Sequence, residues 1–139
     1  NTATVSGTGI TPVTATETVN AEAAPNLAIT KSVSPVPVTE NGTLTYTFRI
    51  QNYGSVAATN TTGVVITDTF APVLNNLTAA LNGTAWTAAT DYTYNEATGT
   101  FSSTAGAITV PAATYTQDST TGAWVVTPGE STLVITGTV

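Results

Sequence analysis

The chain has 139 residues, a formal net charge of −6 and only 7% charged side chains. One lysine and one arginine cannot form the clustered basic surface that nucleic acids require, so nucleic acid is excluded as a partner. The absence of cysteine rules out a disulfide framework and a thiolate metal site. The 34 threonines favour strands over helices. Together these features predict one all-β domain with a tail.

The hydropathy pattern bears on where the protein works. No run approaches the roughly 20 apolar residues of a membrane span, and residues 1–20 lack the basic and apolar regions of a signal peptide. We therefore expect no membrane span and a mature chain. A threonine-rich, lysine-poor, acidic composition without thiols is typical of proteins that prokaryotes export to the cell surface, so we expect an extracellular location.

The N-terminal segment alternates between hydroxyl-bearing and apolar residues over 2–19. This alternation is typical of a half-buried strand. Gly7, Gly9 and Pro12 interrupt it, so two strand segments with a bend are also compatible with the pattern. We interpret 1–25 as a donor strand with its linker, and 26–139 as the body. The apolar residues of the predicted donor interface are Ala3, Val5, Ile10, Val13, Ala15 and Val19.

The body contains many short strand patterns separated by turn signals such as Asn41-Gly42, Asn82-Gly83 and Pro128-Gly129. Short strands at this spacing predict a two-sheet β-sandwich with Greek-key connections. The predicted strands cover 27–34, 43–52, 63–70, 76–81, 84–88, 91–95, 99–103, 107–110, 113–117, 123–127 and 131–139. Alternation predicts two sets of inward-pointing residues: Leu44, Tyr46, Phe48 and Ile50 in 43–52, and Val64, Ile66, Asp68 and Phe70 in 63–70.

Five segments of the body carry a family resemblance: NLAITKSVSP at 26–35, NGTLTYT at 41–47, NYG at 52–54, VITDTF at 65–70, and PGES at 128–131 followed by LVI at 133–135. In order and spacing they resemble the prokaryotic surface repeat known as domain of unknown function eleven. The resemblance covers roughly 26–139. It implies an immunoglobulin-like sandwich that is used as a repeated extracellular module.

One departure from that family concerns the last strand. Family members close with a strand similar to Asn-Thr-Ala-Thr-Val, whereas here this segment stands at residues 1–5. A sandwich without its closing strand exposes an apolar groove and unpaired backbone groups. We therefore expect the N-terminal segment of one molecule to fill the groove of an identical neighbour, which propagates head to tail. Two alternatives remain open: one unit of a tandem polyprotein, or a tail that closes its own body.

The only lysine, Lys31, falls on the apolar face of the predicted strand 27–34, so we expect it to point into the core and to be buried. Asp68 falls on the apolar face of 63–70, and Asn1 shares a face with the apolar donor residues. An amine, a carboxylic acid and a carboxamide are the groups needed for a Lys–Asn isopeptide bond, in which Asp68 would assist attack by a neutral Lys31. Glu130 and Glu17 are secondary candidates for the acid. The alternative is a buried Lys31–Asp68 ion pair.

Other motifs are weaker. The eight acids have no calcium-loop spacing, so no metal and no cofactor is predicted, and no residue set suggests an enzyme. The aromatic residues of the body fit either a carbohydrate-stacking platform or the core. These aromatic residues are Trp86, Tyr92, Tyr94 and Trp124. Four sequons are candidate glycosylation sites, although two lie in Asn-Gly turns: Asn41, Asn60, Asn76 and Asn82.

The sequence thus predicts a structural subunit of an extracellular filament or pilus-like appendage, which polymerises through its N-terminal strand. A spacer module of a tandem surface adhesin or stalk is the first alternative. A carbohydrate-binding module is the second.

Overall fold

The computed structural model describes residues 1–18 and 23–139, and within them every regular element is a strand apart from one 3-10 turn at Asn60–Thr62. The predicted all-β class is therefore confirmed. None of the described helical segments is long and apolar enough to cross a membrane. The strands are β1 (Thr2–Gly7), β2 (Ile10–Thr16), β3 (Leu27–Ser34), β4 (Thr43–Asn52), β5 (Thr67–Thr69), β6 (Asn75–Leu81), β7 (Thr84–Ala85), β8 (Tyr92–Asn95), β9 (Thr100–Ser103), β10 (Thr114–Gln117), β11 (Trp124–Thr127) and β12 (Gly129–Thr138).

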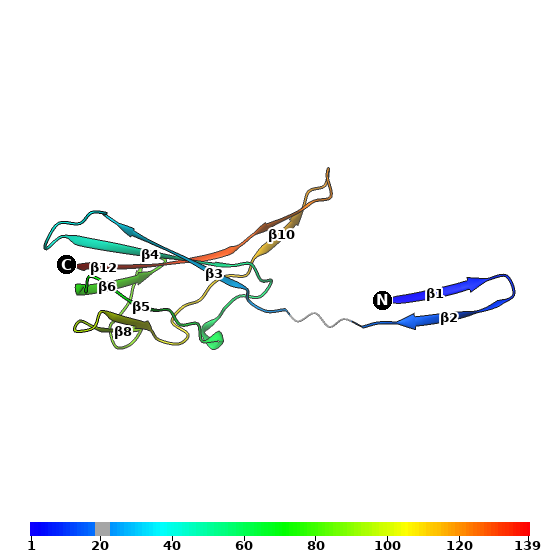
Figure 1. Cartoon of the computed structure of the whole chain (residues 1–139), viewed down its shortest axis with the longest axis horizontal. Helices are drawn as coiled ribbons and strands as arrows, with labels where there is room; N and C mark the ends of the chain where they lie inside the picture. Colours follow the sequence, from blue (N-terminus) through cyan, green and yellow to red (C-terminus); the bar gives the residue numbers. More distant parts are fainter. Residues whose placement is uncertain (19–22) are drawn as a thin grey trace.

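The body is built from two antiparallel sheets (Figure 1). The larger sheet has the strand order β3-β4-β12-β6-β7, and the smaller has the order β5-β9-β8. The central strands of the larger sheet are the ten-residue β4 and β12, which pair along their whole length from Thr43↔Thr138 to Asn52↔Gly129. In both strands alternate residues are buried, because successive side chains of a strand point to opposite faces.

The core lies between the two sheets. The alternating residues predicted to point inward from β4 are all buried, and Leu133 and Ile135 of β12 extend the same layer. Phe101 of β9 and the loop residue Phe70 face them from the other side, with ring centroids 6.2 Å apart. Burial of this many apolar side chains is the main stabilising contribution to such a domain. The inward residues of β4 are Leu44, Tyr46, Phe48 and Ile50.

Three predicted strands differ from the structure. The strand expected at 84–88 is reduced to the two residues Thr84–Ala85. The strand expected at 63–70 is reduced to Thr67–Thr69, although Ile66 and Phe70 on either side of it are buried as predicted. The stretch 107–110 is not a strand, since Val110 forms only an isolated bridge with Ala58. In 63–70 and 107–110 apolar side chains are buried in the core, although outside Thr67–Thr69 no regular described strand pairs with the backbone. The burial is therefore present, while most of the predicted strand hydrogen bonds are absent among the described residues.

Residues 2–16 form a β-hairpin and not one extended strand. β1 and β2 pair antiparallel through a turn in which Gly9 has φ of +75°, a conformation that favours glycine. The glycines that were expected to bend the segment reverse its direction, which corrects the prediction of a single donor strand. No hydrogen bond among the described residues joins this hairpin to the body, and Figure 1 draws it apart from the sandwich.

A second hairpin, β10–β11, projects from the body and is continuous with β12 (Figure 1). All eight of its strand residues are exposed. Its base is fixed to the sandwich, because the Ala113 amide donates to the Gly54 carbonyl and the Tyr115 hydroxyl donates to the Tyr53 carbonyl at 2.5 Å.

Candidate functional site

The larger sheet has an unprotected edge at β3. β3 pairs only with β4 among the described strands, so the backbone groups on its outer side have no strand partner. All eight of its residues are exposed, including Ile29 at 53%. A long, exposed apolar edge strand is a template for pairing with another chain.

An apolar groove runs along this edge, between β3 and the segment 64–72 that contains β5. At one end it is a hollow of about 160 Å³ formed by Leu27, Ile29 and Ile50 against Val64 and Ile66. At the other end, a hollow of about 280 Å³ is formed by Val33, the segment 35–38 and Tyr46 against Pro72. We call these two hollows, with the residues between them, the edge groove. An added strand with one apolar face would cover both sides of this groove, β3 and the segment 64–72.

Lys31 and Asp68 lie between the two hollows. Lys31 Nζ is 2.5 Å from Asp68 Oδ2, which has no other donor among the described residues, while Asp68 Oδ1 accepts from the Thr69 amide. Lys31 Nζ is also 4.8 Å from the ring centroid of Tyr46 and 5.3 Å from that of Phe70. The amine and the acid predicted to act together are therefore in contact, beside aromatic faces that attract a cation.

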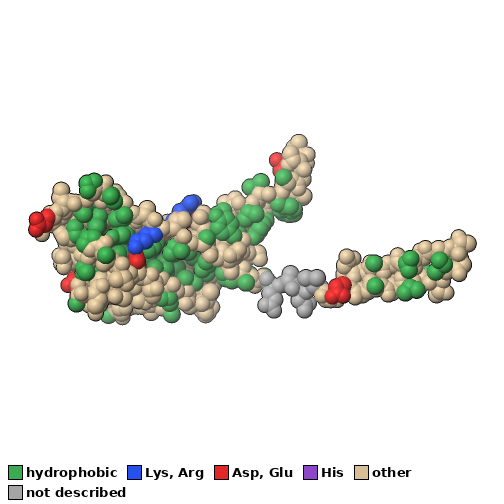
Figure 2. Space-filling view, in the orientation of Figure 1, with side chains coloured by type: hydrophobic (Ala, Val, Ile, Leu, Met, Phe, Trp, Pro, Cys, Tyr) green, Lys and Arg blue, Asp and Glu red, His purple; other side chains and the backbone are tan. Residues whose placement is uncertain are grey.

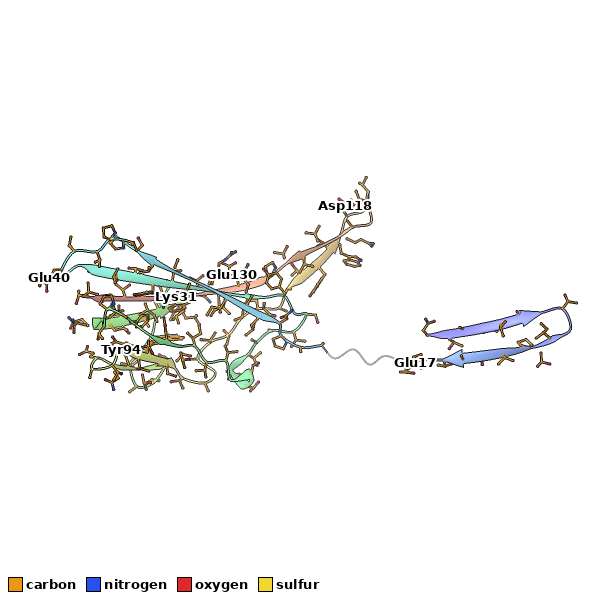
Figure 3. All side chains as sticks on the ribbon, in the orientation of Figure 1. Glu17, Lys31, Glu40, Tyr94, Asp118 and Glu130 are labelled. Carbon is orange, nitrogen blue, oxygen red and sulfur yellow. The ribbon has the colours of Figure 1, made fainter. Side chains whose placement is uncertain are left out.

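The burial of this pair differs from the expectation. The Lys31 side chain is 41% exposed and the Asp68 side chain 18% exposed, because no strand covers β3 on its outer side. Figure 3 labels Lys31 on the body and Glu17 on the N-terminal hairpin. Lys31 therefore faces the groove and is not enclosed in the core, which corrects the sequence interpretation. Exposed ion pairs contribute little to stability because water screens them. A contribution to stability therefore does not explain why a lysine stands at this position on an apolar face.

The N-terminal hairpin has one apolar face that no described residue covers. The register places Ala3 opposite Ala15 and Val5 opposite Val13, and both valines are exposed, at 62% and 61%. The other face is polar, with the hydroxyls of Thr2 and Thr16 3.1 Å apart. The predicted two-faced character is confirmed for these residues. Ile10 is exposed next to the turn, and Val19 lies outside the described residues.

The third predicted member, Asn1, lies at the open end of this hairpin. The Glu17 amide donates to the Asn1 carbonyl at 2.9 Å, so the two residues continue the ladder beyond Thr2↔Thr16. By strand alternation Asn1 and Glu17 lie on the apolar face, in line with Ala3 and Ala15. Within one chain, the structure thus brings Lys31 to Asp68 and Asn1 to Glu17. Sequence reasoning named Glu17 only as a secondary acid, and the hairpin register is the signal that pairs it with Asn1.

Glu130, the other secondary acid, is engaged elsewhere. Arg49 Nη2 is 2.6 Å from Glu130 Oε2 on the outer face of the larger sheet. This hydrogen bond lowers the pKa of the Glu130 carboxyl and raises the pKa of the Arg49 guanidinium. Glu130 is therefore the partner of the single arginine and does not serve Lys31.

The aromatic residues do not form one platform. Trp86 stacks on the buried Tyr92 with centroids 6.5 Å apart, and the Tyr94 hydroxyl is bonded to both the amide and the carbonyl of Leu74. Trp124 is on β11, away from this cluster (Figure 1). The prediction that these four side chains form one carbohydrate-stacking platform is therefore wrong. Three of them pack on or within the core, as the alternative prediction states.

The candidate glycosylation sites differ in availability. Asn82 uses its side chain in the fold, donating to Ser131 Oγ and accepting from the Thr132 amide. Asn41, Asn76 and Asn82 have φ between 50° and 58°, the turn conformation that asparagine tolerates. Asn60 is exposed at the start of the 3-10 turn.

Among the described residues, no group of three His, Cys, Asp or Glu side chains could hold a metal ion.

Comparison with protein-family models, with curated proteins and with solved structures gives no match to this chain.

Proposed function

We propose that this protein is a structural module of an extracellular, prokaryotic filament or surface stalk, in which the N-terminal hairpin of one copy docks in the edge groove of the next. The observation that carries the proposal is a pair of complementary uncovered surfaces: an apolar hairpin face and an apolar groove beside an unpaired edge strand. The likeness to the prokaryotic surface repeat supports the same reading.

The spacing of side chains on the two strands suggests a register. On β3, Lys31, Ile29 and Leu27 follow one another in steps of two residues, as do Asn1, Ala3 and Val5 on the hairpin. If β1 adds antiparallel to β3 with Asn1 beside Lys31, then Ala3 lies level with Ile29. Side chains on one face of a strand are about 6.6 Å apart in both β1 and β3, so the next pair, Val5 and Leu27, is also level.

This register would also enclose the Lys31–Asp68 pair. Removal of water from the pair disfavours the charged forms of both groups and favours transfer of the proton from the amine to the carboxylate. A neutral Lys31 Nζ can then attack the Asn1 side-chain carbonyl carbon, with Asp68 donating a hydrogen bond to its oxygen. The new C–N amide bond replaces the bond to the carboxamide nitrogen, which leaves as ammonia. We propose this covalent joint as part of the docking.

The same contact can join separate subunits, consecutive modules of one longer chain, or a hairpin and its own body. Sedimentation velocity over a range of concentrations identifies the first arrangement, because only contacts between separate subunits give a mass that rises with concentration. We expect the full chain to form concentration-dependent head-to-tail oligomers.

A matched pair of neighbouring substitutions tests the hairpin face. Val13→Asp places a carboxylate on the apolar face, where burying it unpaired is costly, whereas Thr14→Lys places a charge on the polar face. We expect Val13→Asp to abolish oligomers and Thr14→Lys to leave them. Equal behaviour of the two variants, or a chain that stays monomeric at every concentration, would contradict the proposal.

A further inference from the structure

The β10–β11 hairpin exposes an aromatic face that the docking of the N-terminal hairpin leaves unexplained. The register puts Tyr115 opposite Val126 and Gln117 opposite Trp124, so these four side chains share one face. Trp124 is 65% exposed. Figure 2 shows hydrophobic side chains gathered along this projecting arm. Three large apolar side chains on a free arm are costly in water, which indicates that a partner covers them.

The arm begins beside the segment that leads to the N-terminal hairpin. Asn52, fully buried, accepts from the amides of Asn26 and Gly54 and donates to the carbonyl of Pro111. The Ala113 amide at the base of the arm donates to the Gly54 carbonyl. A partner that holds the N-terminal hairpin is therefore tethered within reach of the arm, since only residues 17–26 separate β2 from β3. Such a tether raises the local concentration of the partner.

The opposite end of the body carries a matching surface. β4 runs from Thr43 to Asn52, so the two ends of the sandwich are about 30 Å apart. At the Thr43 end, Pro35, Val36 and Pro37 form an exposed apolar bulge, in which Val36 is 75% exposed. The final residue also lies at this end, where the Val139 amide donates to the Gly42 carbonyl. In the proposed register the N-terminal hairpin runs from Lys31 towards Leu27, so it leaves the Pro35–Pro37 end of the edge groove uncovered. Head-to-tail stacking brings this bulge of one copy to the arm of the next.

We propose that the β10–β11 arm is a second docking element, which packs Tyr115, Trp124 and Val126 on the Pro35–Val36–Pro37 bulge of the copy that receives the N-terminal hairpin. This inference rests on the proposed head-to-tail function. Flat aromatic rings and proline rings make large apolar contacts at a small cost in side-chain entropy, and aromatic anchors dominate many interfaces. The arm would fix the angle between the two bodies.

The test uses the full chain and its oligomers. In a Trp86→Phe variant, Trp124 is the only tryptophan, so its emission and its quenching by acrylamide report on the arm. We expect a blue shift and protection from acrylamide as concentration drives association. If Trp86→Phe does not fold, hydrogen exchange of residues 114–127 and 33–38 in the unmodified chain gives the same information, with both segments slowing on association.

Substitutions then assign the contact. Trp124→Ser and Val36→Ser should each weaken association about tenfold, and the double variant should be little worse than either one, because the two side chains would share one contact. Val125→Ser, on the other face of the arm, is the matched control and should change little. Oligomers that form while Trp124 stays accessible, or that weaken equally with Val125→Ser, would overturn the arm contact and leave the proposed function standing. A chain that never associates would overturn both.

Discussion

The two hairpins of this protein, β1–β2 and β10–β11, have similar local structure and different anchoring. Each is antiparallel with one apolar face, and each turns through a glycine at positive φ, Gly9 or Gly122. The second is fixed to the sandwich by hydrogen bonds from Ala113 and Tyr115. The first has no hydrogen bond to the body among the described residues. Local pattern is thus sufficient to make a hairpin, while contacts from elsewhere decide whether the body itself holds it.

The largest expected difference between the two hairpins is that the first becomes covalently bonded to another copy. We expect oligomers of the full chain to resist boiling in detergent and to run as a ladder, each joint being about 17 Da lighter than the sum of its parts through loss of ammonia. Lys31→Arg should reduce the ladder to monomer completely, because a guanidinium is not a nucleophile at neutral pH.

Asp68→Ala should have the same effect on the ladder, while oligomers seen by sedimentation persist in both variants. Thr30→Arg, on the opposite face of β3, serves as the control for added bulk and charge. Oligomers of the full chain that dissolve in detergent to monomers of unmodified mass would show that Lys31 and Asp68 are only an ion pair.

The next largest effect concerns the groove that would receive the hairpin. Ile29→Asp places a carboxylate on the groove side of β3, and docking would bury it without a partner. A penalty of about 3 kcal/mol corresponds to a roughly 150-fold weaker association. Its neighbour Thr30→Lys, on the other face, should associate normally. Because Ile29 is already exposed, both variants should melt like the parent by circular dichroism; a large fall in melting temperature for Ile29→Asp would mean that the groove belongs to the core.

The anchoring of the second hairpin can be weakened at Asn52. Its side chain makes four hydrogen bonds within the buried junction, including donation to the Val56 carbonyl at 2.8 Å. Asn52→Ala leaves several of these groups unpaired, so we expect the free energy of unfolding to fall by about 2–3 kcal/mol in urea denaturation. Asn95→Ala, which loses one bond in an exposed turn, should cost far less.

The smallest effect lies at the tip of the arm. The amides of Thr121 and Thr120 donate to Asp118, and these bonds lower the pKa of its carboxyl below the ordinary 3.8. Because the folded pKa is the lower one, this stabilisation is present above pH 3.8 and is lost as the pH falls through the folded value. An NMR titration should give a midpoint for Asp118 below 3.8, and the Thr120 and Thr121 amides should shift with it. A midpoint at or above 3.8 would contradict the turn.

The candidate site was only partly predictable. Strict alternation placed Lys31 and Asp68 on apolar faces of their strands, and the structure brings them into contact. The prediction that Lys31 is enclosed was wrong, because alternation indicates which face a side chain takes and not whether another strand covers it. The same limitation applies to Glu130, whose partner Arg49 comes from β4, 81 residues earlier in the chain. The spacing of the glycines left open whether the N-terminal segment bends or reverses direction. The antiparallel pairing of β1 with β2 shows that it reverses.

The sequence by itself determined the all-β class, the alternating burial of β4, and the two-faced character of the N-terminal segment. These properties depend on threonine content and a two-residue period, which are local. Only the tertiary structure decided that β3 is an edge, that Asn52 ties the linker segment and the arm to one junction, and that Asn1 faces Glu17. Each of these depends on which distant strands become neighbours, and that order is set by packing of the whole core, which no local period encodes.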